Sequence, residues 1–171
     1  NFASLYMKGV FMKNYRLHNV MFPIWMLIFF PAMWLYVIPA NFVIDSAVIL
    51  LAAHFAIHRP VKEIWKKSIL KVFVLGFLSD FVGAAFLFCG LYISGYLDFG
   101  TFFEDACNGP QSIGGFFVLL LAVAISGICI YFADYKISFR KLEIEDSEKK
   151  KLALIMALAT APYTFFVPLY W

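Results

Sequence analysis

The chain has 171 residues, of which 63% are hydrophobic, 20% aromatic and 15% charged, and its formal net charge is +3. Soluble domains are about half apolar and about a quarter charged, and a soluble core of this size could not bury so much apolar surface. The composition therefore excludes a soluble globular domain and predicts an integral membrane protein in a lipid bilayer.

The first two predicted spans come from one apolar stretch, residues 20–58, which follows a basic segment at residues 1–19. This stretch is too long for one crossing, because a bilayer core needs about 20 helical residues. Pro39-Ala40-Asn41 interrupts it near the middle. The sequence therefore predicts two helices, 20–38 and 41–58, joined by a tight turn.

The segment after Arg59-Pro60 has apolar residues at helical spacing on one face and lysines on the other. This pattern predicts an amphipathic helix over residues 61–71, which either lies on the membrane or leads into the next span. The third span is predicted at residues 72–97.

A polar, acidic loop separates the third span from the fourth, which is predicted at residues 115–135. Within the loop, Thr101 and Glu104 have capping-box spacing, which favours a short helix. A charged stretch follows at residues 136–151, and the fifth span is predicted at residues 152–171.

The placement of basic residues sets the predicted topology. All 14 Lys and Arg residues fall within residues 8–16, 59–71 and 136–151. With five spans, the three clusters lie on one side, as the positive-inside rule requires. The sequence thus predicts an all-α polytopic transmembrane bundle, a single domain over residues 20–171, with the N-terminus in the cytoplasm and the C-terminus outside. Richness in Phe, Ile and Lys is compatible with an AT-rich bacterial genome, and the expected location is the cytoplasmic membrane of a bacterium.

Small residues predict how the spans pack, because helices in lipid associate through close contact. The third span has Gly76, Gly83 and Gly90 at intervals of seven, on one face. The small residues of the later spans, which should meet this face, are Ala122, Ser126 and Ala133 in the fourth and Ala153, Ala157 and Ala161 in the fifth. In the fifth span Pro162 frees the carbonyl of Leu158. Two interpretations remain: a kink that a threonine satisfies, or a broken helix at a substrate site.

Asp80 is the strongest candidate for a binding residue. It is nine residues past Lys71, near the predicted middle of the membrane, where a carboxylate costs roughly 2.5–3.5 kcal/mol. It lies near the face of Gly76 and Gly83, so it should point into the bundle, with Ser79 beside it. Asp80 is either a site for a proton, a cation or a substrate amine, or a protonated group hydrogen-bonded to a neighbouring helix.

Other polar residues complete the candidate site. Asp45 follows the predicted turn and is expected at a shallow depth, either as a structural cap or on a polar pathway. Thr164 lies close to Pro162, and His54 is a candidate proton relay. Asp45 and His54 are nine residues apart, so they face opposite sides of one helix. Asp134 is expected to form a solvated ion pair with Lys136.

Several chemistries receive no support from the sequence. His54 and His58 have chelating spacing but no third ligand, so no metal site is predicted, and no cofactor motif or catalytic signature is present. The basic clusters flank spans, which argues against nucleic-acid binding. No structural disulfide is predicted among Cys89, Cys107 and Cys129.

Three functional hypotheses follow. The first is transport or binding of a small solute or cation within the membrane, with Asp80 as the binding group and a homo-oligomer or membrane partner expected. The second is a non-catalytic membrane partner, such as an assembly, immunity or regulatory subunit, that docks through residues 61–71 and 136–151. The third, weakest because Asp80 lacks a second titratable group, is a small membrane enzyme acting on lipid.

Overall fold

The computed structural model describes residues 31–97, 101–107, 110 and 112–167, and these residues form helices and no strands. Three of the helices are long and apolar enough to cross a membrane, over Trp34–Ala56, Val61–Tyr96 and Ile113–Ser138. The prediction of an all-helical protein with helices able to cross a membrane is therefore confirmed for the described residues. The predicted segment 1–19 and most of the span 20–38 lie outside the described residues.

The predicted turn at Pro39–Asn41 is wrong. Helix α2 (Pro31–Leu51) runs through Pro39 without interruption and continues as the π turn η2 (Ala52–Ala56). Proline costs a helix one backbone hydrogen bond, but a chain that leaves the helix inside lipid would expose many more unpaired backbone groups. Residues 31–56 are therefore helical throughout, across the predicted turn. The charge argument for the turn depended on basic residues within 1–30, which lie outside the described part.

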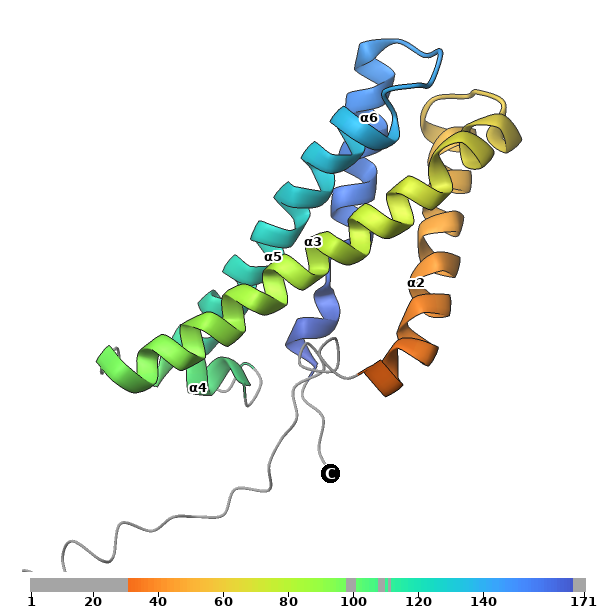
Figure 1. Cartoon of the computed structure of the whole chain (residues 1–171). Helices are drawn as coiled ribbons and strands as arrows, with labels where there is room; N and C mark the ends of the chain where they lie inside the picture. Colours follow the sequence, from red (N-terminus) through yellow and green to blue (C-terminus); the bar gives the residue numbers. More distant parts are fainter. Residues whose placement is uncertain (1–30, 98–100, 108–109, 111, 168–171) are drawn as a thin grey trace, which may run out of the picture.

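Helix α3 (Val61–Leu97) has 37 residues, so it is about 55 Å long and exceeds the hydrocarbon thickness of about 30 Å. Its first three turns are the amphipathic segment predicted over residues 61–71. Of the two predicted arrangements, the structure has the one in which this segment leads directly into the span. Figure 1 shows α3 crossing the bundle obliquely from the α2–α3 loop to the end that carries α4.

The acidic loop contains the predicted short helix, α4 (Phe102–Cys107). Helix α5 (Ile113–Ala133) begins at Ser112, whose hydroxyl accepts a hydrogen bond from the amide of Gly115 at 3.0 Å. The chain then continues through a second π turn, η3 (Asp134–Ser138). These two elements contain the predicted fourth span.

The predicted fifth span is not a continuous helix. Helix α6 (Asp146–Thr160) starts with a capping box between Glu145 and Glu148 and ends just before Pro162. A single turn of 3-10 helix, η4 (Tyr163–Phe166), follows the break. The structure thus has the broken arrangement rather than a kinked helix.

The α2–α3 and α5–α6 connections lie at one end of the bundle, and α4 lies at the other (Figure 1). The first connection carries Arg59, whose guanidinium donates two hydrogen bonds of 3.1 Å to Glu148 at the start of α6. Lys151 donates to the carbonyl of Ala56 at 2.8 Å. Two basic clusters that the sequence placed on one side therefore lie at the same end.

The predicted glycine face of α3 packs as expected at its centre. A Cβ at Gly83 would collide with the hydroxyl of Ser126 and would lie 3.0 Å from the carbonyl oxygen of Ala122, so α3 and α5 meet closely here. The α5–α6 contact uses Gly127, whose Cβ position is 3.6 Å from the carbonyl oxygen of Ala157. The predicted contact between small-residue faces is confirmed where Gly83 meets Ala122 and Ser126, whereas Gly127, which meets Ala157, was not among the residues predicted for it.

Candidate functional site

A cavity of about 400 Å³ lies between α2, α3 and the break that separates α6 from η4. Its lining residues are Val37, Ala40, Asn41, Ile44 and Asp45 from α2, Gly76, Phe77 and Asp80 from α3, and residues 159–165 from the broken segment. Three of the predicted site residues, Asp45, Asp80 and Thr164, are therefore brought together.

Asp45 enters the cavity from the middle of the continuous helix, and 6% of its surface is exposed. The predicted shallow position assumed a chain turn four residues earlier, and that turn does not exist because α2 is continuous there. Asn41 lines the cavity one helical turn before it. Across the cavity, a Cβ at Gly76 would lie 3.7 Å from Asp45 Oδ2, so glycine leaves room beside the carboxylate.

Asp80 follows Gly76 by one turn of α3 and lines the same cavity. As predicted, it points into the bundle. Its Oδ1 atom is buried and has no hydrogen-bond partner among the described residues. Asp80 and Asp45 line the same cavity, from α3 and α2 respectively. The second titratable group that the sequence analysis found lacking at this depth is therefore Asp45.

The carboxyl end of α6 forms the third side of the cavity. The last four carbonyl groups of a helix have no intrahelical partner and carry partial negative charge. Thr160 and Ala161 line the cavity at this end. The carbonyl of Leu158, which Pro162 deprives of its usual donor, accepts a hydrogen bond of 2.6 Å from the hydroxyl of Tyr163.

Tyr163 was missed by the sequence analysis, in which one of the two interpretations had a threonine satisfy this carbonyl. Thr160 instead donates to the carbonyl of Met156 at 2.8 Å. The signal was present in the order of residues, because a phenol directly after Pro162 has the reach to fold back onto the last turn of the helix. Tyr163 both stabilises the break and lines the cavity.

Two predicted site residues lie elsewhere. Ser79 is buried, and its hydroxyl donates to the carbonyl of Leu75 at 2.8 Å rather than facing the cavity. His54 is exposed on η2, with its ring 4.6 Å from that of Phe55. This agrees with the predicted separation of Asp45 and His54 on opposite faces.

Asp134 is not the solvated ion pair that the sequence predicted. It has 1% of its surface exposed at the start of η3, and its Oδ1 accepts a hydrogen bond of 2.8 Å from Ser138. Its Oδ2 has no hydrogen-bond partner among the residues described. Asp134 follows Ser126 and Ile130, which are buried, at intervals of four residues, so it continues the buried face of α5. It does not line the cavity.

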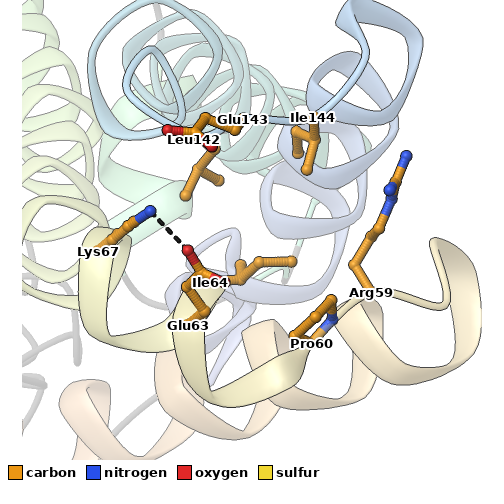
Figure 2. Close-up of a pocket in the computed structure, with 8 residues that line it drawn as sticks. All are labelled: Arg59, Pro60, Glu63, Ile64, Lys67, Leu142, Glu143 and Ile144. Carbon is orange, nitrogen blue, oxygen red and sulfur yellow. Dashed lines mark hydrogen bonds and ion pairs between the residues drawn. The ribbon is translucent and has the colours of Figure 1, made fainter.

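A second hollow, of about 200 Å³, lies at the end of the bundle that carries the basic loops. Figure 2 shows Lys67 reaching Glu63 across one side of it, at 2.6 Å. The other cation of this hollow, Arg59, is paired with Glu148. Both cationic side chains that line this hollow therefore already have carboxylate partners.

The cavity combines negative charge with apolar walls. Two carboxylates and a helix carboxyl end supply the negative potential, and Phe77 and Phe165 supply aromatic surface. Across the described ranges, no three His, Cys, Asp or Glu side chains converge in a way that could hold a metal ion. The chemistry that fits is binding of a small positively charged species.

No family model, no curated protein and no solved structure matches this chain. Over the described residues, the fold is a helical bundle with three helices long and apolar enough to cross a membrane and a fourth, α6, that ends before Pro162.

Proposed function

We propose that this protein binds, and moves across the membrane, a small cation or cationic solute that occupies the cavity between α2, α3 and the break in α6. The observation that carries this proposal is the convergence of Asp45 and Asp80 on the carboxyl end of α6 in one cavity. Each of these groups attracts positive charge, and none of them has a cationic side chain beside it in the cavity lining.

The energetics favour an occupant. A charged residue at the centre of a bilayer costs roughly 2.5–3.5 kcal/mol on insertion scales, and two carboxylates that repel each other cost more. A proton or a cation shared between them relieves this repulsion. Polar residues inside membranes commonly mark pathways for ions and substrates for this reason.

The break in α6 supports transport rather than a static role. Discontinuous helices, with freed carbonyl groups directed at a site near the middle of the membrane, are a recurring way to bind cations in transporters. Helix α6 ends before Pro162, and its carboxyl end lines the same cavity as Asp80.

We propose that the end of the bundle with the α2–α3 and α5–α6 loops faces the cytoplasm of a bacterium. The clusters at residues 59–71 and 136–151 meet at that end, while the loop that contains α4 has no Lys or Arg. The positive-inside rule supports this orientation.

The proposal is tested by carbodiimide labelling. Dicyclohexylcarbodiimide modifies protonated carboxyl groups in apolar surroundings, and a cation that occupies the site protects them. The protein in lipid nanodiscs is treated with the reagent, with and without Na⁺, K⁺, methylammonium or 2-phenylethylammonium as probes. Mass spectrometry then locates the modified residues.

We expect labelling at Asp80 or Asp45 that at least one probe cation suppresses severalfold. Asp134 is the internal control, because it is buried but lies outside the cavity lining, so no probe should protect it. Asp80→Asn should abolish both the protection at Asp45 and any probe uptake into proteoliposomes. If every probe leaves the labelling of both cavity carboxylates unchanged, the proposed function is wrong.

A further inference from the structure

We infer that the cavity is built for an organic ammonium ion with an apolar body, rather than for a bare metal ion or a proton alone. This inference rests on the proposed function and narrows its ligand class. It depends on three features that a bare cation does not require: the size of the cavity, the chemistry of its walls and the rigidity of its aromatic side chains.

The size is the first argument. A volume of about 400 Å³ equals roughly a dozen water molecules, and it falls in the range of about 300–1,000 Å³ typical of small-molecule pockets. A dehydrated metal ion would leave most of this space to water. An amine with a ring or a short alkyl body would fill it.

The walls are the second argument. Val37, Ile44, Phe77 and Phe165 surround the carboxylates with apolar surface, which stabilises a ligand body and offers nothing to water. An ammonium group has three N–H donors and no acceptor. Asp45, Asp80 and the helix end supply acceptors for these donors, and the unpartnered Oδ1 of Asp80 is one of them. Aromatic rings near a cation add further attraction.

The rigidity of the aromatic walls is the third argument. The Phe77 ring meets the Trp34 ring edge to face, with ring centres 6.0 Å apart. Phe165 has 4% of its surface exposed, and its Cε2 is 3.1 Å from the Cβ position of Gly83. Both rings are therefore held by neighbouring helices before any ligand arrives. A preformed apolar pocket lowers the ordering cost of binding an organic molecule.

Equilibrium binding of radiolabelled 2-phenylethylammonium to the protein in nanodiscs tests the inference, with 2-phenylethanol as the neutral analogue. Gly76→Leu places an apolar side chain in the cavity without removing a charge. The backbone can accept this substitution, because a Cβ at Gly76 makes only an ordinary van der Waals contact with Asp45. Gly95→Leu is the matched control on the same helix, since nothing lies within 4 Å of its Cβ position. Size-exclusion profiles establish that both variants fold.

We expect saturable binding that is at least tenfold weaker in Asp80→Asn and in Gly76→Leu, and unchanged in Gly95→Leu. The alcohol should compete at least tenfold less well than the amine. In Gly76→Leu, protection of the carboxylates by methylammonium or Na⁺ should survive while protection by the aromatic amine is lost.

Failure of the inference is distinguishable from failure of the proposed function. If Na⁺, K⁺ or methylammonium protects the carboxylates but the aromatic amine neither binds nor competes, the function stands and the ligand class is wrong. Binding of the amine that is equal in the wild type and in Asp80→Asn would also overturn the inference. If no probe gives protection that depends on these carboxylates, both proposals fail.

Discussion

Replacing Gly83 with alanine should destabilise the bundle, because α3 and α5 leave no room for a methyl group there. The added Cβ would collide with the hydroxyl of Ser126, which is fully buried. It would also lie 3.0 Å from the backbone oxygen of Ala122 and 3.1 Å from Phe165 Cε2. The hydroxyl can rotate, but the backbone oxygen cannot, so the two helices must separate.

The expected magnitude follows from two opposing effects. Overpacking a well-packed contact costs about 1–3 kcal/mol, whereas alanine in place of glycine in a helix gains about 0.5–1 kcal/mol. Gly83→Ala should therefore lower the free energy of unfolding by a net value of about 0–2.5 kcal/mol, and by about 1–3 kcal/mol relative to an alanine substitution that meets no neighbour. At Gly95, on the same helix, a new Cβ has nothing within 4 Å. Gly95→Ala should therefore only raise the free energy of unfolding, through the helix propensity of alanine.

Unfolding of both variants in mixed micelles, followed by circular dichroism as the fraction of sodium dodecyl sulphate rises, gives the two values. Gly83→Ala combined with Ser126→Ala should recover part of the loss, because the double variant removes the nearest colliding atom but keeps the contacts with Ala122 and Phe165. The packing argument is wrong if Gly83→Ala unfolds at the same point as Gly95→Ala.

Two further predictions concern the hydrogen bonds at either end of α6. Tyr163→Phe removes the donor to the Leu158 carbonyl and should cost about 0.6 kcal/mol, and at most about 1.7, in the same unfolding assay; no loss would mean that the break does not depend on this bond. At the other end, the hydrogen bond from Arg59 holds the pKa of Glu148 below its ordinary value of 4.5. This contribution to stability is present above that pH and disappears as the pH falls through the lowered pKa. Melting temperatures of the wild type and Glu148→Gln should therefore differ at pH 7 and converge toward pH 3, and a constant difference would contradict the assignment.

The features that depend on helical periodicity could be predicted from the sequence. The seven-residue interval between Gly76 and Gly83 predicted that both lie on one face of α3. In the structure this face contacts Ser126 at Gly83 and borders Asp45 at Gly76. The inward direction of Asp80 followed from the same geometry. These predictions succeeded because the rotation of side chains around a helix depends only on the count of residues between them.

The effect of each proline could not be predicted locally. Pro39 and Pro162 both interrupt apolar stretches, yet the first lies inside α2 and the second ends α6. At Pro162 the freed carbonyl gains a donor from Tyr163, and Phe165 packs beside Gly83. Such contacts across the bundle decide whether a chain leaves its helix in lipid, and they are set by tertiary structure.

The position of Phe165 links the packing of the bundle to the candidate site. Its ring is held against Gly83, at the seam between α3 and α5, and it also forms part of the cavity wall. One turn before Asp80 on the same helix, Gly76 leaves open space beside Asp45. The glycine face of α3 therefore has two different surroundings: at Gly83 it permits close contact with α5, and at Gly76 it borders the cavity beside Asp45. A change that separates α3 from α5 would release the Phe165 ring and alter the cavity without touching either carboxylate. A substitution at the contact between α3 and α5 should for this reason change both the stability of the bundle and the shape of the cavity.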